Sequence, residues 1–285
     1  MDMATNYVDE NSVGSVIRWF GGKHFLSRDL VPLIPEHHCW ADVFGSGGHM
    51  TVAKRRSKVE VFNDKDHDLI NFLLTLRERR DELISSLSTL PTSRYLFEKW
   101  QREELPKDPF ERAVRWYYLL RNCIIPANGI KSGWRSGKIK NTASDFQNSL
   151  AKLEAFEERF SRVMIECLDY KNMIQRYDSP GTFLFVDPPY VHREHYYKFA
   201  FNEHVELATM LHNIQGKCMV TYYGDPLILD LYKDWHCETF EAKVGTVAKA
   251  ELGQTRRIEK EYVFMNYKPE TKGQLSFDFP VVNDI

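Results

Sequence analysis

The sequence predicts an α/β fold whose parallel sheet carries a ligand site at one edge, and three observations support this prediction. Short apolar runs typical of buried strands occur in two groups, before about residue 65 and after about residue 163. A glycine-rich turn directly follows the first run. Most runs end in a turn or a polar residue, as strands do at the ligand edge of such a sheet. Because the segment between the two groups is mainly helical, we expect one α/β domain interrupted by a smaller helical insert.

Nine segments are predicted as regular elements. The strands, in chain order, are Cys39–Phe44, Val59–Phe62, Val163–Cys167, Thr182–Val186, Lys217–Tyr222 and Glu261–Tyr267. The helices are Lys65–Leu90, Asp108–Arg121 and Ser144–Arg162. Asp108 followed by Pro109 is typical of a helix N-cap with proline in the first turn.

Composition narrows the class of protein. The 285 residues are 43% hydrophobic and carry a net charge of −2, as in a soluble globular protein. No apolar run approaches the roughly 20 residues of a membrane span, and the polar N-terminus does not resemble a signal peptide, so we expect no membrane association and a cytoplasmic location. The five cysteines are scattered without a C-x-x-C pair, which indicates neither a zinc site nor a disulfide framework.

The glycine-rich turn is the first candidate for a ligand site. It reads Phe44-Gly45-Ser46-Gly47-Gly48, and such small residues let the backbone approach a ligand closely. Asp42 precedes the turn. Asp64 follows the next strand, about twenty residues on, where a carboxylate can accept hydrogen bonds from ribose hydroxyls. Because glycine turns also serve tight packing, the turn alone leaves a nucleoside ligand open.

A sharper motif, Asp187-Pro188-Pro189-Tyr190, follows the predicted strand Thr182–Val186. The two prolines remove two N–H donors and stiffen the turn, so the carboxylate of Asp187 and a neighbouring carbonyl point outward as acceptors. An aryl amine needs such acceptors, because its lone pair is delocalised until hydrogen bonds favour a tetrahedral nitrogen. Tyr190 offers a flat face for a base taken out of the stack. The motif predicts methyl transfer to a base amine; an incidental strand-ending turn is the alternative.

A local basic stretch lies in the middle segment. Between residues 112 and 144 there are no acidic residues and seven basic ones: Arg112, Arg115, Arg121, Lys131, Arg135, Lys138 and Lys140. Such a stretch can attract phosphates, although a solvated basic face is the more ordinary explanation.

Taken together, these motifs resemble the Dam-like, D12 class N6-adenine DNA methyltransferases over most of the chain. The segments that carry the resemblance are Trp19-Phe20-Gly21-Gly22-Lys23, Asp42-Val43-Phe44 with its glycines, Asn63-Asp64-Lys65-Asp66, Asp169-Tyr170, Asp187-Pro188-Pro189-Tyr190 and Glu261–Tyr267. The cofactor motifs precede the insert and the catalytic motif follows it, as in the alpha arrangement of amino methyltransferases. Ser46 departs from the family's F-x-G-x-G pattern, which puts in doubt which backbone amides touch the cofactor.

The resemblance implies a Rossmann-like S-adenosylmethionine-dependent fold and site-specific methylation of a flipped-out adenine in double-stranded DNA by direct displacement. It implies Asp187, Pro188, Pro189 and Tyr190 as catalytic residues and no metal. The residues it implies for the cofactor are Trp19, Gly22, Lys23, Asp42, Phe44, Gly45, Ser46, Gly47, Gly48, Asp64, Asp169 and Tyr170. In the family the lysine holds the methionine end, an acidic residue binds the ribose, and Asp169-Tyr170 corresponds to the pair beside the cofactor's adenine.

The domain organisation follows from the same resemblance. Residues 1–74 and 163–270 are expected to form a discontinuous catalytic domain, residues 75–162 a helical DNA target-recognition insert, and residues 271–285 a tail. The residues expected to contact DNA are Asn128, Lys131, Trp134, Arg135 and Lys138. For the charged ones we favour phosphate contacts over base reading, and for Trp134 we favour packing within its loop.

Several alternatives and partners stay open. N4-cytosine methylation, RNA adenine methylation and a catalytically idle DNA-binding module are the rival functions. A cytosine-C5 enzyme is disfavoured because no Pro-Cys occurs, and the spacing of His192, Glu194 and His195 is not that of a zinc protease. Gln274–Phe279 resembles a peptide that docks on the bacterial sliding clamp, although we favour a frayed polar tail because short motifs match by chance. A cognate restriction nuclease is a further possible partner.

Overall fold

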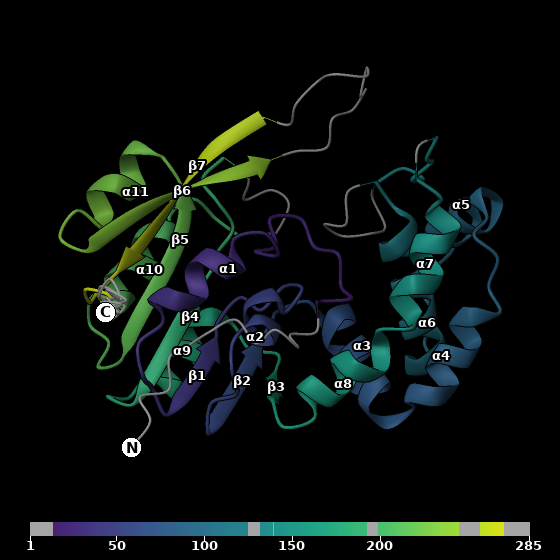
Figure 1. The fold of residues 1–285 in the computed structure, drawn as a ribbon, viewed down its shortest axis with the longest axis horizontal. Helices are drawn as coiled ribbons and strands as arrows, with labels where there is room; N and C mark the ends of the chain where they lie inside the picture. Colours follow the sequence, from purple (N-terminus) through teal and green to yellow (C-terminus); the bar gives the residue numbers. More distant parts are fainter. Residues whose placement is uncertain (1–13, 125–131, 139, 193–198, 245–256, 271–285) are drawn as a thin grey trace, which may run out of the picture.

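The computed structural model describes residues 14–124, 132–138, 140–192, 199–244 and 257–270 (Figure 1). These residues form a sheet on one side of the molecule and a group of helices on the other. The sheet has seven strands in the order β3-β2-β1-β4-β5-β7-β6. The strands are β1 Cys39–Asp42, β2 Val59–Asn63, β3 Met164–Glu166, β4 Thr182–Val186, β5 Lys217–Tyr223, β6 His236–Val244 and β7 Arg257–Met265.

The strand order reverses between β1 and β4. These two strands pair in parallel, with Asp42 opposite Phe185. The chain adds β2 and β3 on the β1 side and β5 on the β4 side, while β7 runs antiparallel to both β5 and β6. The loops after β1 and β4 therefore leave the sheet side by side, at the switch point where open α/β sheets bind ligands. The predicted α/β class is confirmed.

Helices cover both faces of the sheet, which explains why β4 is buried along its whole length. One face packs against α9 (Tyr170–Tyr177), α10 (Glu203–Leu211) and α11 (Pro226–Leu231). The other face packs against α1 (Ser27–Leu30), the 3-10 helix η1 (Val31–Leu33) and α2 (His49–Ala53). Alternation along β1 places Trp40 on this second face and Ala41 on the first.

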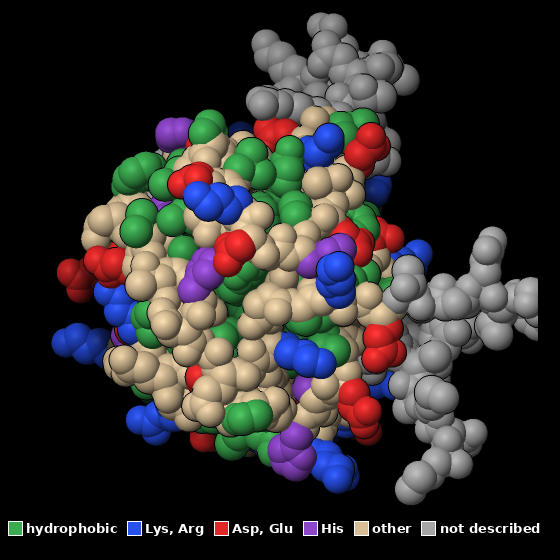
Figure 2. Space-filling model, turned by 90° about the vertical axis from the view of Figure 1, so that its left-hand side faces the viewer, with side chains coloured by type: hydrophobic (Ala, Val, Ile, Leu, Met, Phe, Trp, Pro, Cys, Tyr) green, Lys and Arg blue, Asp and Glu red, His purple; other side chains and the backbone are tan. Residues whose placement is uncertain are grey.

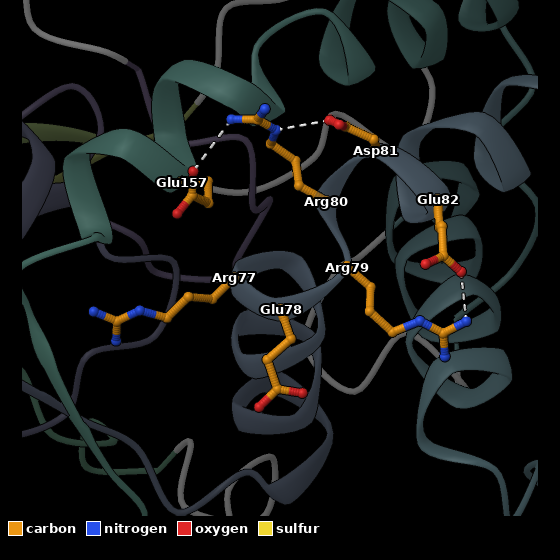
Figure 3. A pocket seen from close by; sticks show the side chains of 7 residues that line it. All are labelled: Arg77, Glu78, Arg79, Arg80, Asp81, Glu82 and Glu157. Carbon is orange, nitrogen blue, oxygen red and sulfur yellow. Dashed lines mark hydrogen bonds and ion pairs between the residues drawn. The ribbon is translucent and has the colours of Figure 1, made fainter.

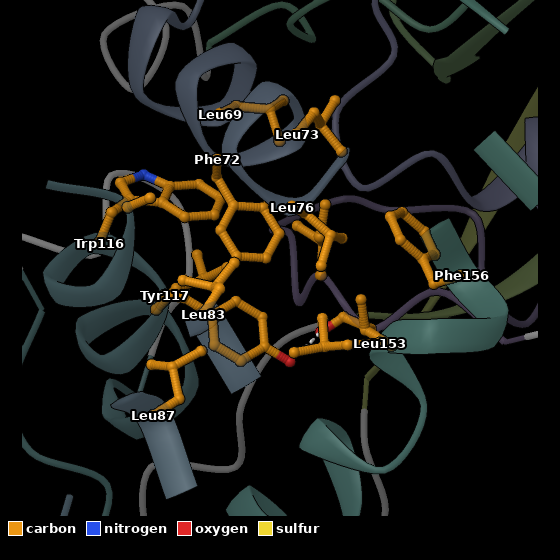
Figure 4. Packing of buried hydrophobic residues seen from close by; sticks show 14 of the residues in the cluster. Leu69, Phe72, Leu73, Leu76, Leu83, Leu87, Trp116, Tyr117, Leu153 and Phe156 are labelled. Carbon is orange, nitrogen blue, oxygen red and sulfur yellow. Dashed lines mark hydrogen bonds between the residues drawn. The ribbon is translucent and has the colours of Figure 1, made fainter. Parts of the chain in front are cut away.

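The remaining helices form what we call the helical lobe. They are α3 His67–Glu78, α4 Arg80–Ser88, α5 Arg94–Arg102, α6 Pro109–Asn122, α7 Thr142–Leu150 and α8 Leu153–Phe160. Figure 4 shows the core of the lobe, where leucines of α3 and α4 surround aromatic side chains of α6. The rings of Phe72 and Tyr117 stack with centroids 4.8 Å apart. Burial of these apolar faces, rather than helix propensity, holds the lobe together.

The structure corrects two predicted helices and adds a strand. Lys65–Leu90 is broken at Arg79, and Ser144–Arg162 divides into α7 and α8. By contrast, Asp108 caps α6 as predicted, accepting from the Glu111 N–H at 2.9 Å. Strand β6 was not predicted because its charged residues interrupt any apolar run. The predicted domain boundary after residue 74 falls inside α3, so the division into domains stays a prediction.

Within the described residues, no helix has both the length and the apolar character needed to cross a bilayer.

Candidate active site

The glycine-rich turn links β1 to α2 at the switch point. Ser46, which stands where the resembled pattern has glycine, adopts a left-handed φ of +51°, so the backbone conformation that favours glycine is kept without it. At Gly47 a Cβ would overlap the ring of His49, which explains why this position is glycine. The turn therefore stays tight despite its serine.

Two carboxylates flank this turn. Asp64 accepts from the N–H of Ser46 at 2.8 Å and from the N–H of Asp66 at 2.9 Å, and burial raises its pKa to about 6. Asp42 accepts from the Thr51 hydroxyl at 2.7 Å through Oδ2, and burial raises its pKa to about 7. Oδ1 of Asp42 is buried without a hydrogen-bond partner among the described residues. An unpaired buried carboxylate oxygen is costly, so this oxygen marks unmet acceptor capacity at the end of β1.

An aromatic group borders the other side of the turn. Phe44 stacks on Tyr170, with ring centroids 5.7 Å apart. The Tyr170 hydroxyl is buried and has no partner within the described part of the chain. Asp169 caps α9, and partial burial works against its ionisation, but hydrogen bonds from Lys65 and from the Lys171 N–H lower its pKa. The structure thus brings Phe44, Asp169 and Tyr170 to the same edge of the sheet as Asp42 and Asp64.

The N-terminal motif forms a turn that delivers a lysine into this edge. The Gly22 N–H donates to the Trp19 carbonyl at 3.3 Å, and Gly21 between them takes a left-handed φ of +76°. Trp19 packs against the core of the helical lobe. Lys23 is only 4% exposed and points to the turn after β4, where its ammonium lies 2.6 Å from Asp187.

Asp187 has an asymmetric environment. Its Oδ1 accepts from Lys23 Nζ at 2.6 Å and from the Thr221 hydroxyl at 2.8 Å, and lies 3.1 Å from the Tyr190 hydroxyl. Its Oδ2 accepts no hydrogen bond from the described residues, and the side chain is 11% exposed. One oxygen is therefore held by the protein and the other is open to a ligand.

Tyr190 joins this group through its hydroxyl. The hydroxyl donates to Glu261 and accepts from Lys23 Nζ at 2.8 Å. Burial, together with the charges of Asp187 and Glu261, raises the pKa of Tyr190 well above its ordinary value. The ring is 8% exposed and meets Tyr223 edge-on at 4.5 Å, so stacking of a base on Tyr190 stays a prediction.

Sequence reasoning missed the roles of Thr221 and Glu261. Thr221 lies in β5 and is fully buried, and Glu261 lies in β7 and is 1% exposed. Only the sheet places them in the Asp187 group, since β4 pairs with β5 with Val186 opposite Val220, and β5 pairs with β7 with Tyr223 opposite Glu261. The available signal was an acidic residue next to the apolar run Tyr262–Met265.

Most arginines of the basic stretch form contacts within the fold. Arg112 pairs with Asp68, and Arg115 donates to the backbone carbonyls of residues 100, 103 and 104. Arg121 is 8% exposed and donates to the Val16 carbonyl at 3.1 Å. These three guanidinium groups link α6 to neighbouring segments, so most of the arginines are not available to phosphates.

The predicted DNA-contacting residues have different surroundings. Arg135 pairs with Asp145 at 2.6 Å, and Trp134 packs edge-on against Phe97 with centroids 5.5 Å apart, as expected for a packed loop aromatic. Lys138 is exposed and forms no ion pair with the described residues. Asn128 and Lys131 lie outside the described residues, as does Gln274–Phe279.

Two other surfaces give no comparable site. The face shown in Figure 2 has basic and acidic side chains interspersed, without one charge dominating. A hollow in the helical lobe at the junction of α3 and α4 is lined by charged residues, several of which form ion pairs with one another (Figure 3). Its ion pairs include Arg80–Glu157 at 3.5 Å and Arg79–Glu82 at 2.6 Å. Its lining residues are Arg77, Glu78, Arg79, Arg80, Asp81, Glu82 and Glu157.

Comparison with known proteins points in one direction. Residues 19–246 match the family described as D12 class N6 adenine-specific DNA methyltransferase. The chain is 26% identical over 239 residues to a DNA N-6-adenine-methyltransferase of Escherichia phage P1, an alignment that covers 77% of this chain and 31% of that protein. It is 27% identical over 182 residues to the DNA adenine methylase of Escherichia coli (strain K12), covering 61% of this chain and 64% of the relative.

A third relative aligns over nearly its full length. The Type II methyltransferase M.CviBI of Paramecium bursaria Chlorella virus NC1A is 22% identical over 266 residues, covering 87% of this chain and 99% of that protein. The chain spans less than two thirds of the length of the phage P1 and Escherichia coli relatives.

Proposed function

The chain belongs to the D12 class N6 adenine-specific DNA methyltransferase family, and from this membership we propose that it transfers a methyl group from S-adenosylmethionine to the N6 amine of adenine in double-stranded DNA. The observation that carries the proposal is the open Oδ2 of Asp187, beside an Oδ1 held by Lys23 and Thr221.

The turn after β4 presents acceptors and few donors. Pro188 and Pro189 have no N–H, so the backbone beside Asp187 can offer only carbonyl oxygens. An exocyclic amine has two hydrogens to donate. In the proposed reaction Oδ2 of Asp187 and an adjacent carbonyl accept both hydrogens, which localises the nitrogen lone pair.

The surrounding edge fits a cationic nucleoside cofactor. Oδ1 of Asp42 and the hydroxyl of Tyr170 are buried and unpartnered among the described residues. Asp42 ends β1 just before the glycine-rich turn, and the ring of Tyr170 stacks on Phe44 of that turn. S-adenosylmethionine, when bound, supplies an electrophilic methyl group on a positively charged sulfur. We assign Asp64 to its ribose, Asp169 and Tyr170 to its adenine, and Lys23 with the turn of Trp19 and Gly22 to its methionine end.

The protein's contribution to the reaction is positioning and electrostatics. Asp187 holds the amine, the glycine-rich turn admits the cofactor closely, and direct displacement requires no covalent bond to the protein. The target base must leave the duplex, which costs a few kcal/mol of unstacking. We assign the predicted insert, residues 75–162, to target recognition, with the exposed Lys138 on a phosphate and residues 1–74 and 163–270 as the catalytic part.

Tritium transfer tests the proposal. Purified protein is incubated with tritium-labelled S-adenosylmethionine and unmethylated genomic DNA, and the digested nucleosides are separated. We expect label in N6-methyladenine. Label in N4-methylcytosine, label only when RNA is supplied, or cofactor binding by calorimetry without transfer would each contradict the assignment and would identify the rival function.

A further inference from the structure

Glu261 is a buried carboxylate that no step described so far uses. It lies in β7, opposite Tyr223 of β5 and Phe240 of β6, and is 1% exposed. A carboxylate in the interior of a sheet is expensive unless it is paired and hydrogen-bonded. Its side chain points to the carboxyl edge, where it meets two members of the Asp187 group.

Glu261 contacts the partners of Asp187 rather than Asp187 itself. Its Oε1 accepts from the Tyr190 hydroxyl and lies 3.2 Å from Lys23 Nζ. Burial raises the pKa of Glu261, and the nearby charge of Asp187 adds to this, while Lys23 opposes it. One ammonium group is thus shared by two carboxylates, 2.6 Å from Asp187 and 3.2 Å from Glu261.

Because Lys23 and Tyr190 each contact more than one acceptor, the hydrogen bonds that each can donate are limited. A phenol has one proton, and the proton of Tyr190 is directed to Glu261, so the Tyr190 oxygen is left to accept from Lys23. The ammonium is held between the two carboxylates and the Gly21 carbonyl, 3.2 Å away. Without the charge of Glu261, both donors would turn towards Asp187, the remaining carboxylate in contact with them.

We propose that Glu261 is a positioning residue for methyl transfer: it holds Lys23 and Tyr190 on the Oδ1 side of Asp187, so that Oδ2 stays open to the amine. This inference rests on the proposed function. Glu261 acts through Lys23 and Tyr190 and does not itself touch the base or the cofactor.

The test is Glu261→Gln, which keeps the shape and one acceptor but removes the charge. Glu241→Gln is the matched control, because Glu241 is an exposed acid on the neighbouring strand β6. For Glu261→Gln we expect the single-turnover rate of methyl transfer to fall roughly 10- to 100-fold, the scale of a small misplacement of reacting groups. The dissociation constants for S-adenosylmethionine and DNA should change by about threefold or less.

A double-mutant cycle separates positioning from a general structural effect. If Glu261 acts partly through Lys23, then the loss of rate caused by Glu261→Gln should be smaller in the Lys23→Met background than in the wild type. Additive losses, a wild-type rate in Glu261→Gln, or a loss confined to cofactor affinity would each overturn the inference. If wild-type protein transfers no methyl group to adenine, the proposed function fails instead, and the two failures are thereby distinguished.

A second variant covers the case in which Glu261→Gln does not fold. Tyr190→Phe keeps the ring and removes only the hydroxyl that joins Glu261 to the group. We expect a folded protein, checked by circular dichroism, with a transfer rate reduced at least about tenfold and unchanged cofactor affinity. A wild-type rate in Tyr190→Phe would overturn the inference by itself.

Discussion

Two charged regions of this molecule use their charges in opposite ways. At the carboxyl edge of the sheet, Lys23, Thr221 and Tyr190 converge on one oxygen of Asp187 and leave the other open. In the basic stretch of the helical lobe, the guanidinium groups of Arg115 and Arg121 are occupied by backbone carbonyls. The first region keeps a carboxylate oxygen without a hydrogen bond from the described residues, whereas the terminal guanidinium nitrogens of the second are hydrogen-bonded within the fold.

The difference teaches that residue type is a weaker guide to function than the hydrogen-bonding capacity that a side chain retains after folding. The basic stretch contains no acidic residue, yet acids from other segments, Asp68 and Asp145, neutralise part of it. The carboxyl edge contains several acids, yet within the described part of the chain Asp187 and Glu261 share the single ammonium group of Lys23. In the proposed function a cationic cofactor and an amine donor complete the edge, whereas the terminal nitrogens of Arg115 and Arg121 are already hydrogen-bonded within the described fold.

The largest effect is expected from removing the open oxygen. Asp187→Ala should reduce methyl transfer by about a thousandfold or more, because the amine loses its acceptor, while S-adenosylmethionine affinity stays within about threefold. Asp230→Ala, at an exposed position of α11, is the control and should transfer at the wild-type rate. Substantial turnover in Asp187→Ala would remove the basis of the comparison.

The next largest effect concerns Arg121, whose terminal nitrogens are hydrogen-bonded within the fold. Arg121→Ala should lower the free energy of unfolding by about 2–3 kcal/mol, because the Val16 carbonyl and Asp145 lose a buried partner. The salt dependence of DNA binding should not change. Lys140→Ala, exposed on the same stretch, should stay within about 0.5 kcal/mol. Chemical denaturation measures both, and a weaker salt dependence in Arg121→Ala would show that this arginine contacts DNA.

A smaller effect is expected at Lys138, the exposed lysine predicted to contact phosphate. Lys138→Ala should reduce the slope of log affinity against log salt by about one and weaken binding evenly across DNA sequences. Fluorescence polarisation at several salt concentrations gives the slope, with Lys140→Ala measured in parallel. An unchanged slope would place the DNA elsewhere on the protein.

The smallest expected effect is a release of protons from Asp42 and Asp64 when the cofactor binds. Burial raises the pKa of Asp42 to about 7 and of Asp64 to about 6, so both are partly protonated near pH 6.5. Since their folded pKa values exceed the ordinary 3.8, the stability that these two carboxylates contribute to the free protein is lost as pH rises from about 4 to about 7. A bound cation favours the ionised forms, so cofactor binding should release protons and tighten over the upper part of this range.

Calorimetry measures that release directly. At pH 6.5 the observed enthalpy of S-adenosylmethionine binding should depend on the ionisation enthalpy of the buffer, and Asp42→Asn should reduce the dependence. An enthalpy that is the same in phosphate and in Tris would contradict a role for these carboxylates in meeting a cation.

Local sequence was sufficient for the parts of the site that are contiguous in the chain. The turns that carry Lys23, Gly47 and Asp187 are defined by glycines and prolines whose backbone limits are independent of context. The α/β class followed from apolar runs that end in polar residues. These features depend on neighbours in the chain, so the sequence alone could predict them.

The tertiary contacts of the site could not be predicted from local sequence. Thr221 reaches Asp187 through the pairing of β4 with β5, and Glu261 reaches Lys23 and Tyr190 through the pairing of β5 with β7. A shift of one residue in the second pairing would turn Glu261 to the other face of the sheet. The basic stretch was likewise interpreted without its partners in the fold, which include Asp68, Asp145 and the Val16 carbonyl. Strand β6 was missed because a half-polar edge strand has no continuous apolar run.

The central claim is that the open oxygen of Asp187 serves the amine of adenine, and genome sequencing tests it most directly. The chain and its Asp187→Ala variant are expressed in a methylation-deficient bacterium, and modified bases are mapped by modification-sensitive reads. The account predicts N6-methyladenine at a defined short sequence with the wild-type chain and none with the variant. Modified cytosine, or N6-methyladenine that persists in the variant, would contradict it.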